Sequence, residues 1–253
     1  MSRHLEVLEQ LRQDRELFSV PTVANREPVY FEPAATVIGL AFDADAFGRE
    51  ELFRLAQRLF LAADEDAQKT SRHVVFCGID AAHGTSVLCA RLGRILATQV
   101  ASQVCIVDAN VRAPELHRLL ELERSDGQFP SPAGMQPRLL HQIASNLWLI
   151  SGHSAATNGG VTASLDQVRS QVKELPPEFA YVVISAPPIG LYSDAALLGQ
   201  WADGVVLVLE ANSTRRVAAR KAKQALEASN VRVLGTVLNN RTFPIPEKIY
   251  RML

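Results

Sequence analysis

One stretch of the chain combines an apolar run, a loop of small residues and the start of a helical pattern. The run begins at His73, the loop holds Gly78 and Gly84, and hydroxyl side chains follow at Thr85 and Ser86. In a strand-loop-helix of this kind, backbone N–H groups and the positive end of the helix dipole bind phosphate. The lysine that would neutralise the outer phosphates is missing, because Thr85 stands in its place. The residues therefore indicate a phosphate-binding loop without its cation.

The spacing within this loop departs from a strict phosphate-binding motif. Five residues separate Gly78 from Gly84, one more than the strict motif has. Gly84 permits close approach of a ligand to the backbone, and Ser86 stands where a magnesium-binding hydroxyl would be. The alternative is that Thr85 or Ser86 caps the following helix, as Ser and Thr commonly do. The spacing alone favours the cap.

A second loop, from Asp108 to Pro114, follows another apolar run. An acid at a strand end that faces a phosphate loop can hold magnesium through water. Arg112 can bind an anion through two parallel hydrogen bonds. In the alternative interpretation Asp108 and Arg112 form a structural ion pair beside a helix start. The sequence does not separate the two.

The third loop, Ser185-Ala186-Pro187-Pro188, is stiffened by its two prolines. A nucleoside triphosphatase needs a carboxylate at such a strand end, for the metal or for the attacking water. Ser185 stands there instead, and a neutral hydroxyl is a poor ligand for a hard cation. This loop therefore lacks the charge that metal-dependent chemistry needs.

Apolar runs and helical patterns alternate along the chain and must position these loops. The runs do not alternate with polar residues, which is typical of strands buried on both faces of a parallel sheet. Strands are expected at 74–78, 103–108, 146–151, 180–185, 204–210 and 232–238, and helices at 86–99, 114–123, 164–175, 193–201 and 214–228. Right-handed crossovers place the carboxyl ends of the strands, with the three loops, along one edge. The sequence predicts an α/β fold, a mostly parallel sheet with helices on both faces.

The remaining segments differ from this pattern. Residues 47–63 predict an amphipathic helix, whose outer side carries Glu51 and Arg54 as a pair. Residues 125–137 are rich in proline and predict an exposed loop. We therefore divide the chain into a helical leader with an irregular linker at 1–46, a main domain at 47–240 and a tail at 241–253.

The overall composition is that of an ordinary globular protein. With 253 residues, 47% of them hydrophobic, and a net charge of −1, the chain can bury a full core and has no global field that attracts nucleic acid. The cysteines, Cys77, Cys89 and Cys105, lie in apolar patterns without metal-site spacing, and we interpret them as core residues. No apolar run approaches the ~18 residues that span a bilayer, and no signal peptide is visible. We expect a cytoplasmic protein.

With these loops in view, the chain resembles the bacterial tyrosine kinases (BY-kinases) of capsule and exopolysaccharide assembly, on the MinD/ParA-like branch of P-loop proteins. Residues 108–117 look like the family motif D-x-D-x-R-x-P-x-L-H, and residues 181–188 look like Y-V-I-I-D-T-P-P. Glu51 and Arg54 match a Glu-x-x-Arg-x-x-Arg helix motif that the family uses in ring assembly, although Gln57 replaces the last arginine. The resemblance covers about residues 47–239 and implies a P-loop NTPase-like fold of three α/β/α layers.

The chain departs from the family where phosphoryl transfer takes place. The family's lysine, its second acid and the carboxylate before the double proline are replaced by Thr85, Asn110 and Ser185. A glycine and an acidic position of the loop are replaced by Ala82 and His83, and the tyrosine cluster of the tail is reduced to Tyr250. Phosphoryl transfer depends on electrostatic stabilisation by lysine and metal, and each loss costs ~10²-fold or more in rate. This is the pattern of a pseudokinase with a degenerate Walker A motif.

The resemblance implies a kinase-like scaffold that acts with the cytoplasmic part of a membrane polysaccharide co-polymerase in exopolysaccharide biosynthesis and export. Such a protein would lie at the inner membrane through that partner, and the residues favour a protein that is not an enzyme. One alternative is an active ATP-dependent tyrosine autokinase or ATPase of the same pathway, with Asp108 as its magnesium acid. Another is a MinD/ParA-like positioning factor. We expect no nucleic-acid partner, and self-association is compatible with the helix motif.

The candidate site residues combine the loops with the resemblance. For nucleotide or phosphate they are Gly84, Thr85, Ser86, Asp108, Arg112 and Asn239. Asn239 is similar to the adenine-contacting position of the superfamily, and is equally a turn residue. A magnesium ion would have only Ser86 and Asp108, so we expect weak binding of ATP or ADP and no firm metal site. Glu51 and Arg54 are candidate oligomer contacts. We interpret the basic face of 214–228 as solvated and the tail as a strap or docking peptide.

Overall fold

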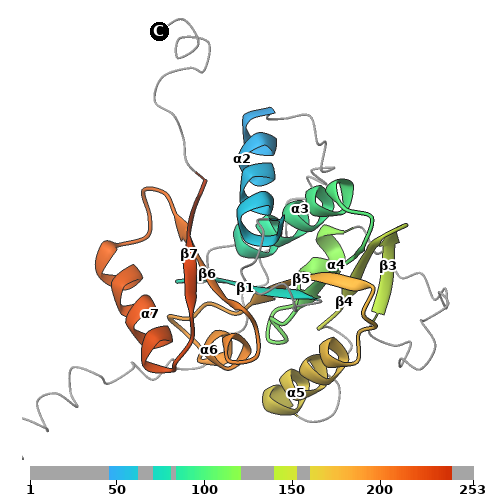
Figure 1. Ribbon diagram of the computed structural model, residues 1–253. Coiled ribbons are helices and arrows are strands. Elements are labelled where there is room, and N and C mark those ends of the chain that lie inside the picture. The colour runs from blue at the N-terminus through green and yellow to red at the C-terminus, as the bar shows by residue number, and fades with distance from the viewer. Residues whose placement is uncertain (1–45, 62–70, 81–83, 121–139, 153–159, 241–253) are drawn as a thin grey trace, which may run out of the picture. The chain divides into compact units, whose positions relative to one another are not determined.

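Apolar runs of Val, Ile and Leu form the strands of a single sheet in the computed structural model (Figure 1). The structure describes residues 46–61, 71–80, 84–120, 140–152 and 160–240, all of which lie in one compact unit, Asp45–Leu253. The predictions for residues 1–45, for the loop 125–137 and for the tail 241–253 lie outside the described residues.

Within the described residues the sheet has seven strands in the order β3-β4-β2-β5-β1-β6-β7. The strands are β1 (Arg72–Gly78), β2 (Gln103–Asp108), β3 (Leu140–Ala144), β4 (Leu147–Ile150), β5 (Phe179–Ala186), β6 (Gly204–Glu210) and β7 (Val233–Asn239). All neighbours pair in parallel except β3 with β4, which are antiparallel. The prediction of a mostly parallel α/β sheet is therefore confirmed, since continuous apolar runs suit strands covered on both faces.

Helices cover both faces of this sheet, as the two hydrophobic clusters show. One cluster joins Val74 and Phe76 of β1 to α2 (Ala46–Ala56), to the following π-helical turn (Gln57–Leu61), to α3 (Gly84–Gln99) and to α4 (Leu116–Leu119). The other joins Val75 and Cys77 to α5 (Gly160–Lys173), α6 (Asp194–Gly199) and α7 (Arg216–Ala228). Alternate side chains of one strand thus enter opposite layers, as the pleat of a strand requires. Cys77, Cys89 and Cys105 are all buried, as predicted.

The structure differs from the predictions at one strand that was not predicted and at two of the predicted helices. Strand β3 was not predicted, because its sequence Leu-His-Gln-Ile-Ala is not an apolar run. It pairs with β4 alone, and an edge strand needs no apolar residues on both faces. The helix predicted for 114–123 is α-helical only at Leu116–Leu119 among its described residues. The helix predicted for 47–63 changes from α-helical to π-helical geometry at Gln57.

Candidate functional site

The loops that the sequence singled out lie at one edge of the sheet. β1 lies between β5 and β6, with Gly78 beside Val208 and Cys77 beside Ala186. β2 lies on the other side of β5, so that Asp108 is in register with Ser185. The carboxyl ends of parallel strands meet at such an edge, where α/β proteins bind their ligands. The convergence predicted from the order of elements is therefore present.

The first turn of α3 begins at this edge. Gly84 lies so close to Asn239 of β7 that an added Cβ would collide with the side-chain nitrogen of Asn239. Thr85 is buried, with 8% of its surface exposed, and its hydroxyl lies 3.2 Å from the position that a Cβ on Gly78 would take. The structure thus brings Gly84, Thr85 and Asn239 together. Residues 81–83, including His83, lie outside the described residues.

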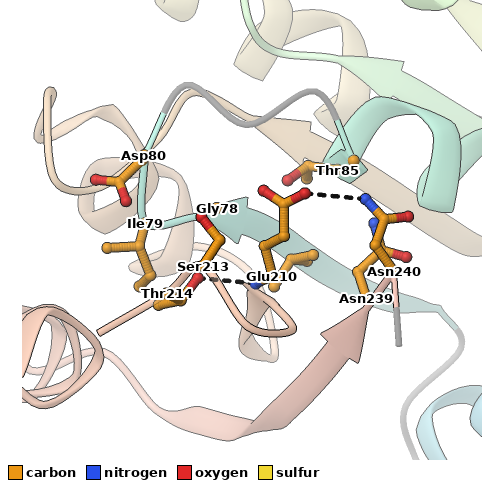
Figure 2. A pocket seen from close by; sticks show the side chains of 11 residues that line it. Gly78, Ile79, Asp80, Thr85, Glu210, Ser213, Thr214, Asn239 and Asn240 are labelled. Atoms are coloured by element: carbon orange, nitrogen blue, oxygen red, sulfur yellow. Dashed lines mark hydrogen bonds between the residues drawn. The ribbon is translucent and has the colours of Figure 1, made fainter. Parts of the chain in front are cut away.

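A small cavity opens beside this helix start (Figure 2). Its volume is about 40 Å³, which has room for about three water molecules. Among its described lining residues two are acidic, Asp80 and Glu210, and none is basic. The others are glycines, apolar side chains, hydroxyls and amides: Gly78, Ile79, Gly84, Thr85, Val208, Ser213, Thr214, Asn239 and Asn240. The cavity is therefore polar and of acidic character.

Glu210 is the feature of this cavity that sequence reasoning missed. It is the last residue of β6, and its carboxylate accepts a hydrogen bond of 3.1 Å from the side-chain amide of Asn240. The backbone N–H of Glu210 donates to the Thr214 hydroxyl at 2.8 Å. A strand-end acid was visible in the sequence. That β6 would lie beside the phosphate loop was not, because the order of strands in a sheet is a tertiary property.

Ser86 and Ser185 face each other in the interior, away from that cavity. Their hydroxyl oxygens are 3.5 Å apart, and 7% of Ser86 and 1% of Ser185 are exposed. Burial raises the pKa of the neighbouring Cys89 thiol, and a hydrogen bond to Ser185 lowers it in part. Ser86 therefore lies beside neutral hydroxyl and thiol groups, although the Asp108 carboxylate is near enough to raise the pKa of Cys89 as well. No group of three His, Cys, Asp or Glu side chains that could hold a metal occurs in the part of the chain that the structure describes.

Asp108 is fully buried at the end of β2. Its carboxylate accepts backbone N–H bonds from Asn110 at 3.3 Å, and from Glu115 and Leu116 at 2.9 Å each. Burial raises the pKa of Asp108 to about 6, although these three hydrogen bonds lower it in part. The side chain thus holds the start of α4. A role of Asp108 in magnesium binding stays a prediction.

Arg112 binds a different acid from the one that its position in the sequence suggested. Its guanidinium makes a forked pair with Asp194, with Nε–Oδ2 at 3.1 Å and Nη2–Oδ1 at 3.4 Å. It also lies 4.1 Å from the centre of the Tyr192 ring. The interpretation of Arg112 and Asp108 as a structural ion pair is therefore wrong, because Asp108 is bonded to backbone N–H groups. Arg112 does not line the cavity, and its phosphate role stays a prediction.

The candidate oligomer contacts lie on the exposed side of α2. Arg54 pairs with Glu51 at 3.0 Å and with Glu50 at 3.2 Å, and all three side chains are at least half exposed. The predicted pairing of Glu51 with Arg54 is confirmed. Whether this pair contacts another copy stays a prediction. Among the described residues, no helix is both long and apolar enough to cross a membrane.

Comparisons with known proteins agree on the fold and on a group of kinases. No family model matches the chain. The chain is 27% identical over 161 residues to the tyrosine-protein kinase YwqD of Bacillus subtilis, covering 62% of this chain and 68% of that protein. It is 44% identical to the tyrosine-protein kinase CpsD of Streptococcus agalactiae over 61 residues, which are 24% of this chain and 27% of CpsD.

Solved structures show the same fold at low sequence identity. The kinase domain of the Escherichia coli tyrosine kinase ETK superposes with a TM-score of 0.63 at 18% identity, covering 78% of both chains. The MinD cell division protein of Aquifex aeolicus gives a TM-score of 0.52 at 18% identity, covering 72% of this chain and 73% of MinD. Together with the order of motifs along the sequence, these similarities show a MinD-like P-loop fold and support a place for the chain in the BY-kinase family.

Proposed function

We propose that the chain is a non-catalytic, kinase-like protein that works with a membrane polysaccharide co-polymerase in exopolysaccharide biosynthesis and export. Its similarity to the BY-kinase family supports the pathway. The lack of catalysis is supported by one observation above all, the facing hydroxyls of Ser86 and Ser185. A magnesium ion at this place would need charged oxygen ligands, and it would find neutral ones.

The residues present do not fit Mg·ATP. A triphosphate needs cations to neutralise it, and the described residues that line the cavity include two carboxylates and no basic group. Arg112 is engaged with Asp194, and Asp108 with three backbone N–H groups. Both side chains are thus engaged within the fold. We therefore derive no catalytic step for this protein.

Two measurements test the lack of catalysis. We expect purified protein to show no magnesium-dependent ATP turnover above that of the Asp108→Ala variant. We also expect mass spectrometry after incubation with ATP to find no phosphotyrosine. Turnover that Asp108→Ala abolishes would contradict the proposal and favour the alternative, an active autokinase or ATPase. The retention of both Ser86 and Asp108 is the observation that favours that alternative.

The partner is tested separately from the chemistry. We expect the chain to co-purify with a membrane polysaccharide co-polymerase from the same gene neighbourhood when the two are co-expressed. ATP should not change the amount recovered, because the proposed scaffold does not use nucleotide. Recovery only in the presence of ATP would instead favour a nucleotide-driven positioning factor.

A further inference from the structure

The cavity at the start of α3 contains a carboxylate where P-loop proteins hold the negative charge of a phosphate. Glu210 and Thr85 both line it, and Figure 2 shows the Glu210 side chain pointing into it on the side where Thr85 lies. Gly78 and Gly84, the glycines of the phosphate loop, line the same cavity. The acid therefore lines the same cavity as these two glycines.

The position of Glu210 is fixed from both its backbone and its side chain. Its carbonyl accepts from the N–H of Thr214 at 2.9 Å, and its own N–H donates to the Thr214 hydroxyl. At the other end Asn240 donates to the carboxylate, from a backbone with a positive φ of 54° that asparagine tolerates. Glu210 is therefore held at the cavity by hydrogen bonds to its backbone and to its carboxylate.

The start of α3 is a place that attracts negative charge. The first N–H groups of a helix have no partner within it, and the helix dipole is positive there. Thr85, of which 8% is exposed, adds a hydroxyl side chain and lines the cavity. In P-loop proteins these groups receive a phosphate. Here the carboxylate of Glu210 supplies negative charge from within the chain.

We propose that Glu210 determines which ligands this cavity accepts, by serving as an internal anion beside the helix start and excluding phosphate groups. The inference deepens the proposed function, on which it rests, because it names the residue that keeps nucleotide out. A fixed like charge beside a ligand weakens its binding by about tenfold or more.

The exclusion of phosphate by Glu210 is tested by isothermal titration calorimetry on three full-length proteins. The ligands are adenosine, ADP and ATP, each with and without magnesium. The proteins are the wild type, Glu210→Gln and the control Glu178→Gln. Glutamine keeps the shape of the side chain and its hydrogen bond from Asn240 but removes the charge. Glu178 is exposed and directly precedes β5, at the opposite end of the parallel strands. The two variants therefore have the same net charge, and only one changes the cavity.

We expect Glu210→Gln to bind ATP at least about tenfold more tightly than Glu178→Gln does. ADP should gain less than ATP, and adenosine should not gain, because the effect depends on phosphate charge. Equal ATP affinities in the two variants would overturn the role of Glu210 and leave the proposed function intact. ATP turnover by the wild type would instead overturn the proposed function. Tight ATP binding by the wild type without turnover would overturn only the inference that Glu210 excludes nucleotide, and not the proposed function.

Discussion

The hydroxyl oxygens of Ser86 and Ser185 lie 3.5 Å apart in the interior, between the first turn of α3 and the end of β5. One hydroxyl can donate to the other, so each serine has a neutral partner within the core. In the family motif that residues 181–188 resemble, the position of Ser185 carries a carboxylate. A pair of neutral hydroxyls therefore stands where the family motif has a charged group.

Ser185→Asp tests whether this place still accepts a metal. A carboxylate there would be buried beside Ser86, with no basic partner among the contacts described for either serine, so we expect a loss of about 3 kcal/mol of unfolding free energy at pH 8. The loss should shrink at pH 5, where the acid can protonate. Urea denaturation at the two pH values measures it, with Ser185→Asn as an uncharged control. Recovery of stability on addition of magnesium would show that the missing carboxylate at position 185 is what prevents metal binding in the wild type, whereas no recovery would show that other groups are missing as well.

Asp108 makes the stability of the protein depend on pH. Its pKa is about 6 in the folded protein and 3.8 when exposed, so the folded state binds more protons between these values. The contribution of Asp108 to the free energy of unfolding is therefore greatest below about pH 4. It falls as the pH rises through about 6, by about 3 kcal/mol in total. We expect Asp108→Asn to remove this dependence while it keeps an acceptor for Glu115 and Leu116. Denaturant unfolding from pH 4 to pH 8 measures both proteins. An unchanged pH slope in Asp108→Asn would show that another group is responsible.

The ion pair of Arg112 with Asp194 should contribute to stability through the buried partner. The Asp194 side chain is 6% exposed and that of Arg112 is 32% exposed. Arg112→Met leaves the acid buried without its cation, and we expect a cost of about 2 kcal/mol. Adding Asp194→Asn should recover part of that loss, since it removes the uncompensated charge. A double-mutant cycle measured by thermal or urea unfolding gives the coupling, and additive losses would show that the pair is not coupled.

Restoring the lysine alone should not restore nucleotide binding. We expect the ammonium group of Thr85→Lys to pair with Glu210, because both positions line the same small cavity. ATP affinity, measured by calorimetry, should therefore rise in Thr85→Lys with Glu210→Gln and stay near wild type in Thr85→Lys alone. Equal ATP affinity in the single and double variants would show that Glu210 does not compete for the introduced lysine. A melting temperature for each variant checks that it is folded.

Much of the fold follows from local sequence, for a physical reason. A strand buried on both faces is apolar along nearly all of its length. For this reason β2 and β6 were predicted with their observed bounds. The loops after β1, β2 and β5 could be placed together because parallel connections bring carboxyl ends to one edge. The identity of the residues at Thr85, Asn110 and Ser185 is likewise a property of the sequence alone.

The partners of the charged side chains are a different matter, because they depend on distances that only the folded chain defines. Arg112 and Asp194 are 82 positions apart, and nothing local marks them as partners. Asp108 binds the backbone of Glu115 and Leu116, whose N–H groups carry no signature in the sequence. Glu210 reaches the phosphate loop only because β6 pairs with β1. The sequence alone determined most of the strands, the loops that follow them and the missing charges. The tertiary structure decided which charged side chain contacts which partner, because these contacts depend on the order of strands in the sheet.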